Sequence, residues 1–158
     1  MKIIAATDGS NFKNEKFGWA WVATFPPNQF QPNSIGYGCE LIDNFWVHAW
    51  NVAAECTAVI ELLRSFGPEN EFEIFHDYEG LGRWARGEWS ANKPCSSGYC
   101  KELKRLNRNV TFAQVKGHSG HAMNELADKL AKRALREQPR ITVVKPITAD
   151  LKFIDWDK

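Results

Sequence analysis

Strand-like and helix-like patterns of apolar residues follow one another in this chain in an order that restricts the folds open to it. A short apolar run predicts a buried strand at 2–7, and bulky residues at alternating positions predict strands at 18–24 and 35–42. Apolar residues then recur at intervals of three and four over 51–66, which is typical of an amphipathic helix, and a Gly-Pro pair ends it. Three successive strands with short connections indicate an antiparallel meander.

The second half of the chain alternates between the two patterns. It predicts a strand at 72–76, a short helix at 79–86, a loop at 87–98, a helix at 99–107, a strand at 110–115 and a helix at 122–136. The whole order predicts an α/β fold with a five-stranded mixed sheet, in which two parallel strands extend three antiparallel ones and helices flank the sheet. A length of 158 residues suits one domain, which we place at 1–138. The tail at 139–158 has a β-like stretch at 141–144 and no assigned role.

Composition excludes several classes of protein. Hydrophobic residues make up 44% of the chain and charged residues 25%, which is ordinary for a globular protein and excludes a disordered one. No apolar run approaches the roughly 20 residues that cross a bilayer, and the apolar stretch at the N-terminus is too short for a signal peptide. We therefore expect a cytoplasmic monomer with no membrane partner. Its four cysteines should be free thiols: Cys39, Cys56, Cys95 and Cys100.

The formal net charge of +1 hides a division of the chain into acidic and basic parts. Residues 1–82 hold 4 basic and 11 acidic residues, a net charge of −7, whereas residues 83–108 hold 7 basic and 2 acidic residues, a net charge of +5. The remaining residues, 109–158, have a net charge of +3. An overall charge near zero argues against a nucleic-acid binder, but a local basic surplus favours one.

Four acids occupy distinctive places in the predicted elements. Asp8 follows the first strand, Glu55 lies one turn into the first helix, Asp77 ends the fourth strand and Asp128 lies in the last helix. A right-handed crossover would make the first and fourth strands parallel neighbours, so that Asp8 and Asp77 lie side by side. Clustered carboxylates need a cation, and oxygen ligands favour Mg²⁺ or Mn²⁺. Two such ions are an established way to cleave a phosphodiester.

Each acid also has a purely structural interpretation. Asp8 and Asp77 could cap turns, and Glu55 could be a solvated helix residue. Asp128 could form an ion pair with Lys132, four residues further along the same helix. Taken together, and with the motifs around them, the four acids favour a metal site.

Four segments carry a resemblance to a known family: 7–10, 51–55, 76–78 and the Gly-His-Ser-Gly-His segment at 117–128. On these residues the chain resembles the type 1 ribonuclease H family, of the bacterial ribonuclease HI kind, from about residue 2 to residue 136. The resemblance implies the ribonuclease H-like fold, with 1–138 as the catalytic domain. It also implies endonucleolytic hydrolysis of the RNA strand of RNA/DNA hybrids with two Mg²⁺ ions, or Mn²⁺ as a substitute, leaving 5′-phosphate and 3′-hydroxyl ends.

The resemblance also implies roles for individual residues. Asp8, Glu55, Asp77 and Asp128 match the metal-binding catalytic carboxylates. His118 matches a loop histidine that assists proton transfer or product release, and a histidine titrates in the range that such a role needs. Asn124 matches a residue that supports the metal ligands from behind.

Other positions match the family's substrate-binding surface. Asn14 and Asn51 match residues that contact the RNA strand, where a 2′-hydroxyl distinguishes RNA from DNA. Five basic and aromatic residues follow the third carboxylate, where the family places its DNA-strand groove: Arg83, Trp84, Arg86, Trp89 and Lys93. The two tryptophans could equally be partly core.

The chain departs from the family pattern in two places. The segment 12–16 replaces the usual Gly/Pro-rich turn, so that Asn11 is a substitute for Asn14. Trp50 and Val52 stand where many members carry residues that hold a DNA phosphate. Two alternatives remain open: a non-catalytic module that binds hybrid or double-stranded RNA, and an integrase-like relative that cuts DNA.

Overall fold

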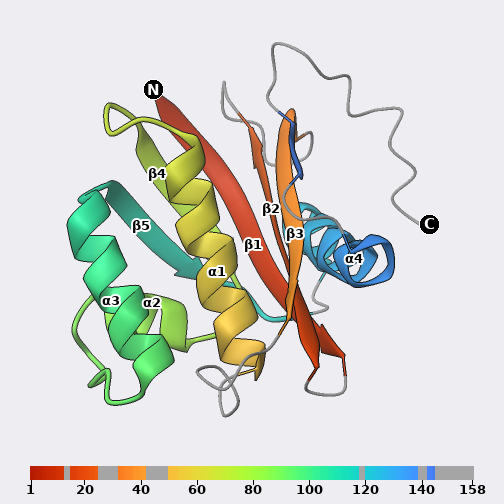
Figure 1. Cartoon of the computed structure of the whole chain (residues 1–158). Coiled ribbons are helices and arrows are strands. Elements are labelled where there is room, and N and C mark those ends of the chain that lie inside the picture. The colour runs from red at the N-terminus through yellow and green to blue at the C-terminus, as the bar shows by residue number, and fades with distance from the viewer. Residues whose placement is uncertain (13–14, 25–31, 42–49, 118–119, 139–141, 145–158) are drawn as a thin grey trace.

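A computed structural model describes residues 1–158 except 13–14, 25–31, 42–49, 118–119, 139–141 and 145–158. One mixed sheet forms the centre of the molecule (Figure 1). Its strands are β1 (Lys2–Phe12), β2 (Lys16–Thr24), β3 (Ser34–Leu41), β4 (Glu71–His76), β5 (Asn109–Gln114) and β6 (Thr142–Val144).

The sheet has the order β5-β4-β1-β2-β3-β6. Strands β1, β2 and β3 form an antiparallel meander, and β4 and β5 extend it in parallel from the β1 edge. This arrangement confirms the predicted five-stranded mixed sheet, including the predicted neighbourhood of the first and fourth strands. Strand β6 lies in the β-like stretch of the tail and adds a sixth strand, antiparallel to β3.

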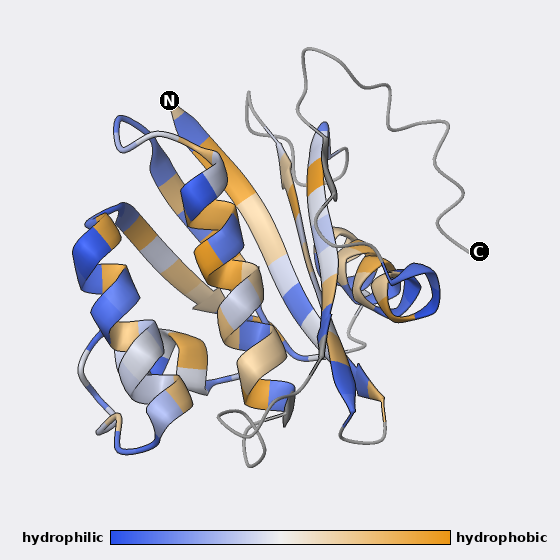
Figure 2. Ribbon diagram, in the orientation of Figure 1, coloured by the Kyte–Doolittle hydropathy of each residue, from blue (hydrophilic) through white to orange (hydrophobic). Residues whose placement is uncertain are grey.

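Helices cover both faces of the sheet (Figure 1). The helices α1 (Trp50–Ser65), α2 (Gly80–Ala85) and α3 (Pro94–Leu106) lie on one face, and α4 (Ala122–Glu137) lies alone on the other. Figure 2 shows α1, α3 and α4 each carrying hydrophobic and hydrophilic residues, as expected of helices with one face on a sheet. None of these described helices is long and apolar enough to cross a membrane.

The two faces of β2 carry side chains of different size. Phe17, Trp19 and Trp21 are fully buried on the face covered by α1, whereas Ala20 and Val22 point to the face covered by α4. Successive strand residues point to opposite faces, so one face of β2 carries bulky rings and the other carries small groups. On this second face α4 presents small residues of its own, including Ala127 and Ala131. Small side chains on both surfaces let this helix pack close to the sheet.

Two element boundaries differ from the sequence prediction by more than two residues. Strand β1 does not end at residue 7 in a polar turn, because its residues from Asp8 to Phe12 continue to pair with β2. Helix α3 begins at Pro94, inside the predicted loop at 87–98. A proline suits the first position of a helix. At the residue before it, the backbone N–H of Lys93 donates a hydrogen bond to Ser96 Oγ at 3.3 Å. The four cysteines are free, as predicted.

The first turns of α1 lie unusually close to β1 at Gly9. A β-carbon added at this position would lie 2.5 Å from Ala54 Cβ and 2.8 Å from the backbone nitrogen of Glu55. Only glycine leaves room for this approach, so Gly9 sets the distance between β1 and the part of α1 that carries Glu55.

We expect Gly9→Ala to lower the free energy of unfolding by roughly 1–3 kcal/mol, because α1 must shift away from β1 to admit the methyl group. Urea denaturation of the full chain measures the change. Gly98→Ala is the matched control, because a β-carbon at Gly98 in α3 has nothing within 4 Å. This control should be neutral or stabilising by about 0.5–1 kcal/mol. Equal stability of the Gly9→Ala variant and the unmodified chain would contradict the argument.

Candidate active site

Three of the predicted acids lie where β1, α1 and β4 converge. Parallel pairing of β1 with β4 places Ala6 opposite Phe75, and Asp8 and Asp77 each lie two residues further along. The parallel register therefore brings these two acids to one place, as the sequence predicted. Glu55 reaches the same place from α1, which Gly9 allows to come close.

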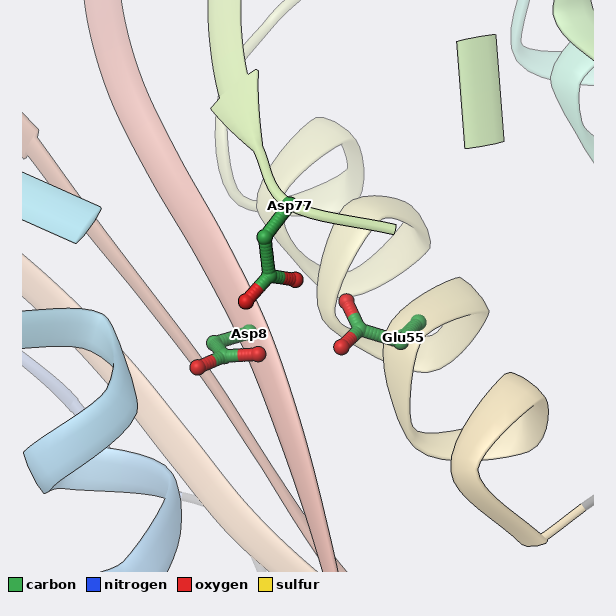
Figure 3. Close-up of side chains that lie close together, drawn as sticks. All are labelled: Asp8, Glu55 and Asp77. Atoms are coloured by element: carbon green, nitrogen blue, oxygen red, sulfur yellow. The ribbon is translucent and has the colours of Figure 1, made fainter. Parts of the chain in front are cut away.

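The three carboxylates point toward one another (Figure 3). One oxygen from each of Asp8, Glu55 and Asp77 lies within 4.8 Å of the other two. Asp8 is 4% exposed and Glu55 is 7% exposed, while Asp77 is half-buried. Two of the three negative charges are thus almost removed from water, and the third lies beside them.

The surroundings oppose ionisation of these acids. The pKa of Asp8 is raised to about 7, mainly by burial and also by the negative charge of Asp77. Burial also raises the pKa of Glu55 well above its usual range, followed by the charge of Asp8. Without a cation, this pair holds a proton at pH values where an exposed carboxylic acid has lost it.

The donor set fits a divalent metal ion with oxygen ligands. Three carboxylates within reach of one point supply the hard oxygen ligands that Mg²⁺ and Mn²⁺ prefer. Glu55 Oε2 is buried and has no hydrogen-bond partner among the residues that the structure describes. A buried carboxylate oxygen without a partner is costly, and a cation would satisfy it.

The fourth predicted acid, Asp128, is not one of the three clustered carboxylates. It is half-buried on α4, and its Oδ2 accepts a hydrogen bond from Lys132 Nζ at 2.9 Å. The ion pair that the sequence allowed as a structural interpretation of Asp128 is therefore present. Asp128 is still near enough to contribute to the raised pKa of Asp8. In this structure the charge of Asp128 is balanced by a lysine of its own helix.

The loop before α4 starts beside the cluster. A β-carbon at Gly117 would lie 3.3 Å from Asp77 Oδ2, so the chain passes directly against this carboxylate. His118 itself lies outside the described residues. At the start of α4, His121 Nδ1 accepts a hydrogen bond from the backbone N–H of Asn124 at 3.3 Å and caps the helix.

Asn124 occupies a buried position near the start of α4. Its side chain is 3% exposed, and its Oδ1 has no hydrogen-bond partner within the described part of the chain. It lies in the first turn of α4, one turn before Asp128.

The predicted substrate-binding residues are spread over several elements. Asn51 is exposed in the first turn of α1, and Asn14 lies outside the described residues. Lys93 is exposed where α3 begins. Of the two positions that depart from the family pattern, Val52 packs against the core and Trp50 begins α1.

The arginines of the predicted DNA-strand surface already have anionic partners. Arg83 Nε pairs with Glu79 Oε1 at 2.7 Å, and its Nη1 pairs with Glu88 Oε1 at 3.2 Å. Arg86 pairs with the other oxygen of Glu88. These exposed ion pairs reduce the positive charge that the sequence alone suggested at 83–86.

The two tryptophans of this surface differ in environment. Trp84 packs against the core and makes ring contacts with Tyr78, Tyr99 and Trp89. Trp89 is 40% exposed. Trp84 is thus partly core, as the alternative interpretation held, whereas Trp89 presents much of its ring to solvent.

Two glycines within the sequence motifs have structural tasks that the sequence analysis did not assign. Gly9 admits α1 to β1, and Gly117 admits the loop before α4 to Asp77. The available signal was a glycine directly next to a predicted site residue, Asp8 in one case and His118 in the other.

Known proteins resemble this chain over most of its length. The RNase H family profile matches residues 1–136. The chain is 31% identical over 150 residues to a ribonuclease H of Marinobacter nauticus, covering 86% of this chain and 95% of that protein. It is 32% identical over 148 residues to a ribonuclease H of Tropheryma whipplei, covering 84% of each.

Solved structures share the fold. RNase H1 from Halobacterium salinarum superposes with a TM-score of 0.65 at 22% identity, covering 87% of this chain and 99% of that one. LC11-RNase H1, solved in complex with an RNA/DNA hybrid, superposes with a TM-score of 0.64 at 21% identity, covering 84% and 99%. With the family match over most of its length and curated relatives above 30% identity, the chain belongs to the RNase H family and is a ribonuclease H enzyme.

Proposed function

We propose that this enzyme hydrolyses the RNA strand of RNA/DNA hybrids endonucleolytically with two Mg²⁺ ions, leaving 5′-phosphate and 3′-hydroxyl ends. The observation that carries the proposal is the cluster of Asp8, Glu55 and Asp77, whose oxygens lie within 4.8 Å of one another. Support also comes from the family match and from a structural neighbour that was solved with an RNA/DNA hybrid. Mn²⁺ would substitute in the same oxygen ligands.

The four acids would hold the ions, Asp8, Glu55 and Asp77 from the cluster and Asp128 after release from Lys132. Bound ions would supply an activated water and stabilise the leaving oxygen. Lys132 balances the charge of Asp128 when no cation is present. Asn124 would support the metal ligands, and His118 would assist proton transfer or product release.

The surrounding surface would position the hybrid. Asn51 and Asn14 would contact the RNA strand, where a 2′-hydroxyl identifies it. The DNA strand would lie along the exposed residues after Asp77, with Arg86, Trp89 and Lys93 as the most accessible contacts and the half-buried Arg83 and Trp84 beside them. Ion pairs to Glu79 and Glu88 would exchange for phosphate contacts.

We also propose that residues 1–138 form the catalytic domain and that the enzyme works as a cytoplasmic monomer. The profile match ends at residue 136, close to this boundary.

Asp8→Asn should abolish Mg²⁺-dependent cleavage of an RNA/DNA hybrid, because it removes a charged ligand from the buried cluster. We expect a loss on the order of 10³-fold or more, about 4 kcal/mol in the activation barrier, with hybrid affinity largely retained. Cleavage of a labelled hybrid and a binding assay in EDTA measure the two effects. Glu69→Gln is the control, because Glu69 is an exposed carboxylate outside the cluster. An undiminished rate for Asp8→Asn would refute the proposed role.

Stability should depend on pH through Asp8. Its folded-state pKa of about 7 lies above the usual value of 3.8, so the folded state binds more protons between these values and loses stability as pH rises. In EDTA, Asp8→Asn should therefore stabilise the chain increasingly from pH 4.5 to pH 7.5, by at most about 1.4 kcal/mol per pH unit.

Urea denaturation of both chains at pH 4.5 and pH 7.5 measures the effect of Asp8→Asn on the free energy of unfolding at each pH. Effects of the substitution that do not depend on pH cancel when the two values are subtracted. Adding Mg²⁺ at pH 7.5 should stabilise the unmodified chain more than the Asp8→Asn variant, because the cation binds the charged form. The same effect of Asp8→Asn at both pH values would contradict the assignment.

Substrate discrimination separates the proposal from its two alternatives. Matched RNA/DNA hybrid, duplex DNA and duplex RNA of one sequence should show Mg²⁺-dependent cleavage of the hybrid's RNA strand alone. Cleavage of duplex DNA would indicate an integrase-like relative, and binding without cleavage would indicate a non-catalytic module. End-group analysis of the products checks for 5′-phosphate and 3′-hydroxyl ends.

A further inference from the structure

A pocket of about 430 Å³ opens between the end of α1, α2, the end of α3 and the first half of β5. Part of its wall is apolar and comes from Leu63, Leu103 and Phe112. Three cationic residues also line it: Arg86, Lys104 and Arg108. Lys104 and Arg108 belong to the basic segment at 83–108, and the proposed function gives them no role.

The pocket is separate from the carboxylate cluster. Thr111 in its wall pairs with Glu73 of β4, four residues before Asp77, which corresponds to about 13 Å along the strand. Leu63 lies eight residues after Glu55, about 12 Å along the axis of α1. Most of the pocket therefore lies away from the cluster, and Phe112 is the wall residue that reaches furthest toward it, with its ring centroid 5.7 Å from that of His76.

The charges around the pocket are unbalanced. None of the described residues that line it is acidic. Glu88 pairs with Arg86 from outside the lining, and Glu102, the acidic residue of α3, pairs instead with Arg64 and Arg105. Lys104 and Arg108 thus face the pocket without a carboxylate in its wall.

Arg108 is held in place with unused donor capacity. Its Nη1 donates to the carbonyl oxygen of Leu106 at 2.7 Å, which fixes the guanidinium. Its Nε is buried and has no hydrogen-bond partner in the described part of the chain. A buried N–H without an acceptor is costly, and none of the described residues supplies an acceptor for this one.

We propose that this pocket binds the phosphate group of a nucleotide, with Lys104 and Arg108 on the phosphate and the apolar wall against the sugar or base. Guanidinium and ammonium groups are the side chains that proteins use for phosphate, and Asn107 and Thr111 add polar groups to the same wall. The volume exceeds that of a lone phosphate and lies in the usual range of small-molecule sites. The phosphate could belong to a free nucleotide or to a nucleic-acid strand, and the experiment distinguishes these sources.

The test is a titration of the isotopically labelled full chain by NMR in EDTA, which leaves the carboxylate cluster without metal and repulsive to anions. The probes are adenosine 5′-monophosphate, adenosine, inorganic phosphate and a short single-stranded DNA. At least one phosphate-bearing probe should cause saturable shifts at the amides of Lys104, Asn107 and Thr111, and adenosine should not. Saturation by the DNA alone would assign the phosphate to a strand, and saturation by the mononucleotide would assign it to a free nucleotide.

Lys104→Glu should weaken binding at least about tenfold, because it replaces a cation on the phosphate by an anion. Lys101→Glu is the matched control, since Lys101 is exposed on the same helix and does not line the pocket. The affinity of this variant for the phosphate probe should change less than about twofold. Equal weakening by both substitutions, equal binding of adenosine, or no saturable shift with any phosphate probe would overturn the proposal. Hybrid cleavage plays no part in this test, so its outcome is independent of the proposed function.

Discussion

Mutual repulsion of three carboxylates in a nearly dry place is the constraint on which this structure depends. Asp8, Glu55 and Asp77 come from a strand, a helix and the end of a second strand, and each reaches the cluster only if the three elements keep their spacing. Gly9 sets the spacing of α1 from β1, and the parallel register of β1 with β4 aligns the two aspartates. Burial of these acids in their charged form costs free energy, and the raised pKa values of Asp8 and Glu55 reflect that cost. A bound cation would recover that energy, which would couple metal binding to the stability of the fold.

The two sides of the sheet contribute differently to this arrangement. Bulky rings of β2 fill the space under α1, while small residues on the other face let α4 pack close enough for Asp128 to influence Asp8. Lys132 keeps the charge of Asp128 balanced on α4. The cluster of three acids is therefore rigidly framed, and the fourth acid has an alternative partner on its own helix.

The net charge of +1 hides the fact that acidic and basic residues gather at different places in the structure. Acids of the first half of the chain supply the cluster, and the basic segment at 83–108 supplies cations elsewhere. Part of that segment is neutralised by local ion pairs, as at Arg83 and Arg86, while Lys104 and Arg108 reach a separate pocket. A count of charged residues along the sequence does not distinguish these cases, because it does not show which charges are already paired.

The sequence by itself determined the order of strands and helices, the mixed sheet and the convergence of Asp8 with Asp77, because these depend on local apolar spacing and on a general rule of chain handedness. It did not determine that β1 continues past Asp8, that α3 begins at Pro94 or that β6 joins the sheet, since these depend on pairing partners distant in sequence. The sequence left open whether Asp128 pairs with Lys132 and whether Trp84 packs into the core, and the structure decided both. Tertiary structure alone brought Lys104 and Arg108 to one pocket. In each case several local partners compete, and the choice among them follows from how the elements pack.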